Sequence, residues 1–220
     1  MNSTIIQILG VAMMLLLVSV VFLNITKRNI TAVMLLAIQS CAISLAIFAA
    51  AWHEQSLELF FAGLFTLAIK GIFASIFFRR VIVKYSLPFS GKTYLNTPLT
   101  LVVAALLVGI AYSQLFEPWY ALLASVGTVA VLKGSLGAFF VTLLLMVNKK
   151  GALSEIIGIL TLENTIILIA LVLGLRHNLQ LEVAITFDIT VWICIAAVYL
   201  NLMYRQFGSL DVSALNRLKD

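Results

Sequence analysis

Four ionisable side chains lie inside long apolar segments of the sequence. Lys70, Lys133 and Glu163 fall near the middle of predicted helices, and Asp188 falls about two turns into another. A charged side chain at the centre of a bilayer costs about 2.5–3.5 kcal/mol on insertion scales, so four of them carry a penalty of roughly 10 kcal/mol. That penalty is comparable with the net stability of a whole fold. We therefore expect each side chain to be paired, hydrated or neutral, and to face protein rather than lipid.

Acids and amines at a common depth have the chemistry of a proton relay. Burial disfavours the charged form of such groups, which allows them to bind and release protons near neutral pH. Glu163 and Asp188 are expected roughly 12–18 Å from the outer ends of a helical hairpin, at about 1.5 Å per residue, so one or two water molecules could bridge them. The proton-path candidates are therefore Glu163, Asp188, Lys70 and Lys133, with Glu155 as the candidate entrance.

The same residues also have a purely structural interpretation. Buried ion pairs, or polar contacts with a neighbouring subunit, could fix an assembly without moving any proton. Glu155 lies in the first turn of its predicted helix, where a negative side chain suits the helix dipole. Glu54, Glu58, Glu117 and Glu182 lie at the predicted outer helix ends and are expected to be solvated.

Other kinds of site are not indicated by the residue pattern. Cys41 and Cys194 lie within apolar segments without CxxC spacing, so they are expected to be small packing residues. His53 and His177 lie near segment ends, whereas a membrane haem requires histidines on facing helices. Phosphate-binding loops, dinucleotide glycine patterns and serine–histidine constellations do not occur. We therefore expect no self-contained active site, no cofactor and no metal.

The elements that must position these residues are membrane helices. Of the 220 residues, 63% are hydrophobic and only 10% are charged, and the mean hydropathy is +1.13. At about 20 apolar residues per span, the sequence predicts an all-α, polytopic membrane protein of about seven helices. The first helix lacks the basic segment and the cleavage site of a signal peptide, so we expect it to be retained. The predicted spans are 5–23, 31–52, 57–83, 98–116, 119–147, 152–175 and 180–204.

The basic residues predict how these helices cross the membrane. With seven spans and the N-terminus outside, all but three of the 14 Lys and Arg residues fall on the inner side. The eleven inner residues are Lys27, Arg28, Arg79, Arg80, Lys84, Lys92, Lys149, Lys150, Arg205, Arg217 and Lys219. Only Arg176 falls outside, which favours an outer N-terminus and an inner C-terminus. Basic loops beside anionic lipid also account for the net charge of +5, so we predict no nucleic-acid partner.

The two halves of the chain resemble each other. Gln39 and Glu163 occupy equivalent positions about 124 residues apart, each in a helix that follows a basic pair. We therefore expect a three-helix unit that is used twice in parallel orientation. The predicted parts are a first unit with its inside loop at 1–97, an extra helix at 98–118, and a second unit with an inner tail at 119–220.

Two segments resemble a known family. The stretch GILTLEN, which ends at Glu163-Asn164, and the tail GSLDVSALNRLK at 208–219 resemble component E of hydrogenase-4 and of related formate hydrogenlyase-type complexes. The resemblance extends over essentially the whole chain. The C-terminal half is also similar to the small K-type membrane component of respiratory complex I and to the small C-type component of multisubunit Na+/H+ antiporters.

The resemblance implies roles for two of the candidate residues. The K-type family carries a buried glutamate of a lateral proton path on its second helix, and Glu163 matches that position. A second glutamate lies on the third helix of that family, where Asp188 is the best match and is one methylene shorter. In the first repeat, Gln39 stands where the carboxylate would fall, so the resemblance implies that one unit conducts and the other braces.

The resemblance also implies partners and a location. The partners are antiporter-like membrane subunits, a membrane anchor subunit and a peripheral hydrogenase-like redox arm, in the cytoplasmic membrane of a prokaryote. We accordingly predict a non-catalytic membrane subunit of a complex I-like oxidoreductase that contributes to a lateral proton path. Two alternatives stay open at this point: a structural spacer between the antiporter-like subunits and the redox module, and a subunit or carrier of the monovalent cation/H+ antiporter type.

Overall fold

The computed structural model describes residues 3–84, 93–123, 127–174 and 198. Apart from isolated bridge residues, among them the bridge between Thr93 and Lys149, the regular structure of these residues is helical. In chain order the elements are α1 (Ser3–Ile25), α2 (Asn29–Glu54), α3 (Leu57–Thr66), the π-helix η1 (Leu67–Ala74), α4 (Ser75–Lys84), α5 (Thr97–Ala111), the short 3₁₀-helix η2 (Gln114–Phe116), α6 (Glu117–Leu123), α7 (Val129–Asn148) and α8 (Ala152–Val172).

Within the described residues, six helical segments are long and apolar enough to cross a membrane. They are Ser3–Ile25, Asn29–Glu54, Leu57–Lys84, Thr97–Leu123, Val129–Asn148 and Ala152–Val172. The protein is therefore an all-α, multi-pass membrane protein, which confirms the predicted fold class. The seventh predicted helix, at 180–204, lies outside the described residues.

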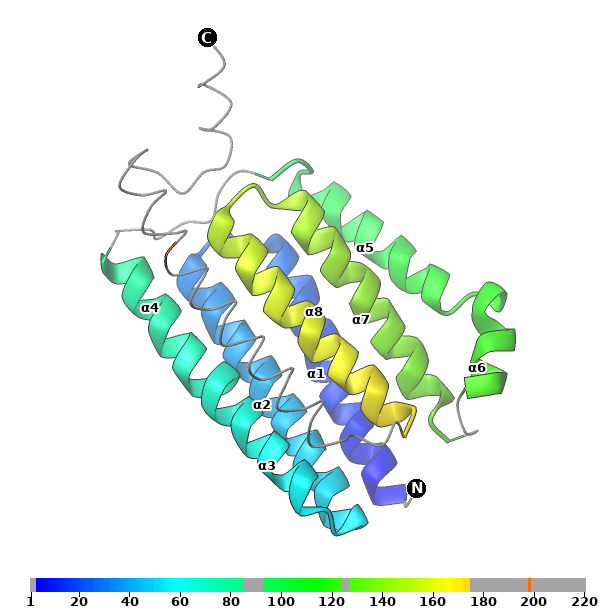
Figure 1. Ribbon diagram of the computed structural model, residues 1–220. Coiled ribbons are helices and arrows are strands. Elements are labelled where there is room, and N and C mark those ends of the chain that lie inside the picture. The colour runs from blue at the N-terminus through cyan, green and yellow to red at the C-terminus, as the bar shows by residue number, and fades with distance from the viewer. Residues whose placement is uncertain (1–2, 85–92, 124–126, 175–197, 199–220) are drawn as a thin grey trace.

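The spanning segments form one bundle in which successive segments run in opposite directions (Figure 1). The pair α1–α2 packs against the pair α7–α8, so helices from the two ends of the described chain lie side by side. The third span, which comprises α3, η1 and α4, packs along α2, while α5 packs along α7. This arrangement brings the third span and α8 to neighbouring faces of α2.

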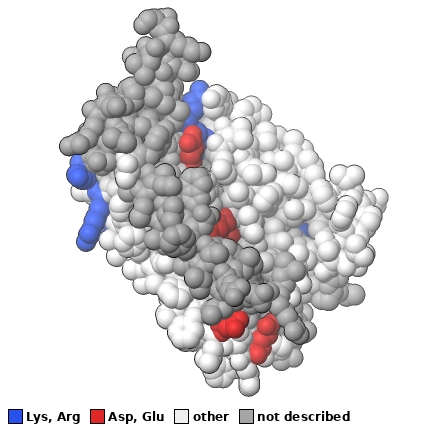
Figure 2. Space-filling view, viewed as in Figure 1, with Lys and Arg blue, Asp and Glu red and all other residues white. Residues whose placement is uncertain are grey.

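One end of the bundle carries the short turns that follow α1 and α7. The Nζ atom of Lys149 donates a 2.7 Å hydrogen bond to the carbonyl oxygen of Thr26, which joins the two turns. The side-chain Oδ1 of Asn148 accepts from the backbone N–H of Leu95 at 2.8 Å, which ties in the segment before α5. We call this the inner end, because the positive-inside rule assigns its basic residues to that side. Figure 2 shows most of the visible Lys and Arg surface toward this end, whereas acidic surface lies at the opposite, outer end and also at mid-height and beside the basic patch.

The core consists of two clusters of buried apolar side chains, one above the other along the bundle axis. The inner cluster includes Leu23, Leu36, Phe78, Leu145, Ile157 and Leu160. The outer cluster includes Leu16, Val20, Ile43, Ala138, Val141 and Leu168. On α2 the boundary between the clusters falls between Leu36 and Ile43, and on α8 it falls between Leu160 and Leu168. The candidate site lies at this boundary.

The predicted bounds of the fourth and fifth spans are wrong. The chain leaves helix α5 at Ala111, resumes a helix at Glu117, and begins α7 only at Val129. Pro118 explains the new start, because proline has no N–H to donate and suits the first turn of a helix. The hydroxyl of Tyr120 donates a 2.6 Å hydrogen bond to the carbonyl oxygen of Ala111, which satisfies the end of α5. Continuous hydrophobicity across this region hides the interruption from the sequence.

Candidate functional site

Lys70 lies at the centre of the candidate site. It belongs to the π-helix η1 and is 0% exposed. Its Nζ atom lies 3.1 Å from Oε2 of Glu163 on α8, and it donates a 3.2 Å hydrogen bond to Oδ1 of Asn164. One ammonium group therefore joins the third span to two consecutive residues of α8.

The network continues from α8 to α2. The side-chain amide nitrogen of Asn164 donates a 3.2 Å hydrogen bond to the hydroxyl oxygen of Ser40. Gln39, beside Ser40, and Thr161, one turn before Asn164, are also completely buried. We call these six residues the polar layer: Gln39, Ser40, Lys70, Thr161, Glu163 and Asn164.

The polar layer lies near the middle of the membrane-spanning height. Gln39 is ten residues after the start of α2 and Glu163 is eleven after the start of α8, so both lie about 15 Å from the inner end at 1.5 Å per residue. The hydrocarbon core of a bilayer is about 30 Å thick. The layer thus separates the inner and outer apolar clusters at a depth where bulk water does not reach.

The geometry of the pair defines what it can do chemically. An unpaired ion in such surroundings is strongly disfavoured, and an opposite charge at hydrogen-bonding distance offsets that cost. The pair is neutral overall either as ammonium and carboxylate or as amine and carboxylic acid. These two forms differ by the transfer of one proton between Nζ of Lys70 and Oε2 of Glu163, so the titration of the two groups is a property of the pair.

Local structure explains how Lys70 reaches α8. The π-helix widens the third span at Leu67–Ala74, and such insertions are frequent at functional sites. Gly71 follows Lys70, and a Cβ atom built there would lie 3.3 Å from Leu67 Cδ1 and 3.7 Å from Cys41 Sγ. The Cys41 distance is an ordinary van der Waals contact, so Gly71 lies directly against α2, as small residues do in membrane bundles.

The predicted site residues fall into separate places. Lys70 and Glu163 are brought together, whereas Asp188 lies outside the described residues. Glu155 lies in the first turn of α8, eight residues before Glu163 and on the same helix face, because helical positions four apart are aligned. It is thus about 12 Å nearer the inner end than Glu163, and it is not a member of the polar layer.

The predicted depth of Lys133 is wrong. Because α7 begins at Val129, Lys133 lies in the second turn of this helix, near the outer end. Its Nζ atom forms an ion pair with Glu117 and lies 5.4 Å from the ring centroid of Tyr120. Glu117 was expected to be solvated, and half of its side chain is indeed exposed although it is paired. This second ion pair joins α6 to α7 and is separate from the polar layer.

Two members of the network were not recognised as site residues from the sequence. Ser40 and Asn164 complete the hydrogen bonds between α2, η1 and α8. A signal for them existed in the repeat, since Gln39-Ser40 and Glu163-Asn164 are adjacent polar pairs at equivalent positions. The two hydrogen-bonded residues of this contact are therefore equivalent positions of the predicted repeat.

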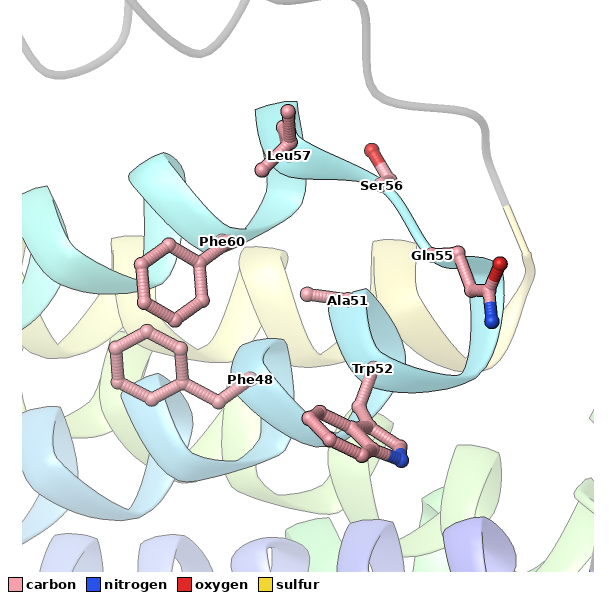
Figure 3. Close-up of a pocket in the computed structure, with 7 residues that line it drawn as sticks. All are labelled: Phe48, Ala51, Trp52, Gln55, Ser56, Leu57 and Phe60. Atoms are coloured by element: carbon pink, nitrogen blue, oxygen red, sulfur yellow. The ribbon is translucent and has the colours of Figure 1, made fainter.

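A pocket of about 420 Å³ opens at the outer end between α2 and α3. Figure 3 shows the rings of Phe48 and Phe60 next to each other on one side of it, with their centroids 5.3 Å apart. The lining residues are Phe48, Ala51, Trp52, Gln55, Ser56, Leu57 and Phe60. None of these side chains is ionisable, so the pocket has no group that could exchange protons with the polar layer.

Among the residues that the structure describes, no group of three or more His, Cys, Asp or Glu side chains could hold a metal ion.

Comparisons with protein-family models, with curated protein sequences and with solved structures found no match for this chain. The resemblance to hydrogenase-4 component E therefore remains a prediction. The functional argument rests on the polar layer.

Proposed function

We propose that this chain is a non-catalytic membrane subunit that takes part in lateral proton transfer, as a component of a complex I-like oxidoreductase of the membrane-bound hydrogenase type. The observation that carries the proposal is the ion pair between Lys70 and Glu163 at mid-depth. Ionisable residues inside membrane segments commonly mark proton or ion pathways. The remainder of the proposal, including its partners, comes from the family resemblance.

The burial of the pair favours a functional role over simple packing. Replacing a buried ion pair by apolar residues of similar volume is often neutral or stabilising, and apolar clusters already fill the bundle on both sides of the polar layer. Stability alone therefore does not require a lysine and a glutamate here. Proton transfer does require them, because each group must change its charge within reach of the other.

The unequal exposure of the two groups suggests a direction for the exchange. Glu163 has 21% of its side chain exposed, whereas Lys70 has none. A proton that arrives at the carboxylate of Glu163 neutralises it and removes the countercharge of the Lys70 ammonium. The ammonium then loses its own proton more readily, while Asn164 holds Nζ in place through its Oδ1. The proton that leaves Lys70 passes to an acceptor that a partner subunit would supply, and transfer of the Glu163 proton to the free amine then restores the ammonium–carboxylate pair.

The proposed partners are antiporter-like membrane subunits, an anchor subunit and a peripheral redox arm, in the cytoplasmic membrane of a prokaryote. Glu155 and Asp188 enter this proposal as further candidates for the path, whereas Lys133 is paired with Glu117 at the outer end and does not. Purification through a tag on this chain in mild detergent, followed by mass spectrometry, tests the partner set. Recovery of redox and antiporter-like subunits supports it, whereas a lone chain that transports ions in liposomes would favour an autonomous carrier.

The proton role is tested in the assembled complex with Glu163→Gln. The variant keeps the shape of the side chain but cannot change its charge, so we expect proton translocation per assembled complex in proteoliposomes to fall at least tenfold, even where loss of the Lys70 countercharge lowers the yield of complex. Glu117→Gln is the matched control, because it removes the carboxylate of the other ion pair, at the outer end. Wild-type translocation by an assembled Glu163→Gln complex would refute the proposal.

A structural spacer is the second candidate function. The observation that favours it is the hydrogen-bonded network itself, which holds α2, η1 and α8 together. A spacer predicts that Glu163→Gln lowers the amount of assembled complex and leaves the proton translocation per complex unchanged. The same experiment therefore separates the two functions when translocation is normalised to the assembled complex.

A further inference from the structure

Two side chains of the polar layer are buried without partners. Gln39 is 0% exposed, and within the described part of the chain neither its Oε1 nor its Nε2 atom has a hydrogen-bond partner. Thr161 is also 0% exposed, and its Oγ1 atom is unpaired in the same sense. Buried side-chain polar atoms in proteins nearly always have a partner, either protein or ordered water. The amide of Gln39 can form about four hydrogen bonds, so a completely dry site would leave an unusually large demand unmet.

Helix geometry directs both side chains toward the inner apolar cluster. Gln39 lies one turn outward from Leu36 on α2, and Thr161 lies one turn outward from Ile157 on α8. Leu36 and Ile157 belong to the same inner cluster, so both polar side chains continue helix faces that meet in that cluster.

The hydrogen bond between Asn164 and Ser40 fixes the relative height of the two helices. From this contact, Gln39 is displaced by one residue and Thr161 by three residues toward the inner end. At about 1.5 Å per residue, the two positions differ in height by about 3 Å. The unpaired atoms therefore occupy a common level at the inner boundary of the polar layer.

The groups that could bind the unpaired atoms of Gln39 and Thr161 differ in their chemistry and in how they could reach these atoms. A side chain from a partner subunit would have to open the bundle to reach Gln39, because this residue is completely buried within its own chain. A cation or an anion would need a countercharge, and the nearest ionised groups, Lys70 and Glu163, already balance each other. Water is neutral, small and both a donor and an acceptor, so it suits an amide and a hydroxyl together.

We propose that Gln39 and Thr161 form an internal water-binding site at the inner boundary of the polar layer. A water molecule there can donate a hydrogen bond to Oε1 of Gln39 or accept one from its Nε2 group. It can also donate to the hydroxyl oxygen of Thr161 or accept from that hydroxyl. The site is independent of the proposed proton role, since the same unpaired atoms need solvation in a spacer or in a carrier.

A double-mutant cycle on the full-length chain tests the site. The wild type, Gln39→Leu, Thr161→Val and the double variant are unfolded reversibly in mixed micelles of rising SDS fraction. Each single variant is expected to lower the ratio of folded to unfolded protein, because it removes one partner of the shared water. Once the first substitution has displaced the water, the second substitution removes fewer hydrogen bonds. The folded-to-unfolded ratio of the double variant should therefore be about fivefold or more above the value that additivity predicts.

The control cycle combines Gln39→Leu with Ser135→Ala. The Ser135 hydroxyl is buried but bonds within its own helix, to the carbonyl oxygen of Val131 at 2.8 Å, so these two changes should be additive. A Gln39→Leu variant that is more stable than the wild type, or an additive main cycle, would overturn the site. Should Gln39→Leu fail to fold, Gln39→Met, which keeps the length of the side chain, takes its place in both cycles.

Discussion

The Nζ atom of Lys70 lies 3.1 Å from Oε2 of Glu163, and the lysine is completely buried whereas the glutamate is 21% exposed. The two residues come from the third span and from α8, which meet at neighbouring faces of α2. The carboxyl group is therefore the side of the pair that the surroundings reach first, and the ammonium group depends on Glu163 and Asn164 for its countercharge and its hydrogen bonds.

Removal of the lysine alone should destabilise the fold strongly. Lys70→Met leaves the carboxylate of Glu163 without its buried partner, and breaking such a pair costs about 3–5 kcal/mol. Lys70→Met combined with Glu163→Leu removes both charges and should recover most of that loss. The free energy of unfolding in mixed micelles measures both variants. A double variant as unstable as Lys70→Met would show that packing, rather than the unpaired charge, sets the penalty.

The amide of Asn164 should contribute more than the hydroxyl of Ser40. Asn164 accepts from Lys70 and donates to Ser40, so Asn164→Val deprives both neighbours and should lower the free energy of unfolding by about 2–3 kcal/mol. Ser40→Ala removes only the last bond of the network and should lower it by about 1 kcal/mol. The same unfolding measurement compares the two. Equal losses of stability in the two variants would contradict a network in which Asn164 makes two hydrogen bonds and Ser40 makes one.

The stability of the inner end should increase at alkaline pH because of Lys149. This residue is 4% exposed, its Nζ donates to the carbonyl oxygen of Thr26, and burial lowers the pKa of its ammonium group from 10.5 to about 8. Between these two values the unfolded chain binds more protons than the folded chain, so stability rises with pH across this window. Below pH 8 the folded protein must hold a buried ammonium group, beside the cations Lys27 and Lys150.

Thermal unfolding in detergent between pH 7.5 and 10 measures this effect. The wild type should gain about 2–3 kcal/mol relative to Lys149→Met across the window, since each pKa unit corresponds to about 1.4 kcal/mol. Lys150→Met is the matched control, because this neighbouring lysine is only partly buried and lies over the ring of Tyr94. A pH dependence that persists in Lys149→Met would exclude Lys149 as its source.

The outer ion pair should contribute little to stability. Glu117 is half exposed and pairs with Lys133 near the start of α7, and exposed pairs are worth about 0–1 kcal/mol. Glu117→Gln should therefore change the free energy of unfolding by no more than about 1 kcal/mol, with a smaller change at high salt. A loss as large as that of Lys70→Met would mean that this pair belongs to the structural centre of the bundle.

The close contact between α2 and α3 should depend on Gly63. A Cβ atom at this position would lie 2.9 Å from the ring of Phe48, and Ser44 donates a 2.7 Å hydrogen bond to the Gly63 carbonyl oxygen. Gly63→Ala should therefore cost about 1–3 kcal/mol through overpacking. Gly109→Ala is the control, because nothing lies within 4 Å of its Cβ position in α5, and helix propensity should make it neutral or stabilising by up to about 1 kcal/mol.

The membrane-spanning helices could be predicted from the sequence because a bilayer imposes a local requirement. A chain that crosses it needs about 20 apolar residues and must satisfy every backbone group within its own helix. The described helices confirm six spans of this kind. The bounds 119–147 failed because α6 and α7 are both apolar, so hydropathy alone does not register that α6 ends at Leu123 and α7 begins at Val129.

The sequence by itself also determined that Lys70 and Glu163 require partners, because charged groups in apolar segments are too costly to leave alone. It did not determine that they are each other's partner, and Asp188, the expected neighbour of Glu163, lies outside the described residues. The pairing depends on the π-helix at Leu67–Ala74 and on the packing of this span and of α8 against neighbouring faces of α2. These are properties of packing between distant segments, so only the tertiary structure could decide which acid meets which amine.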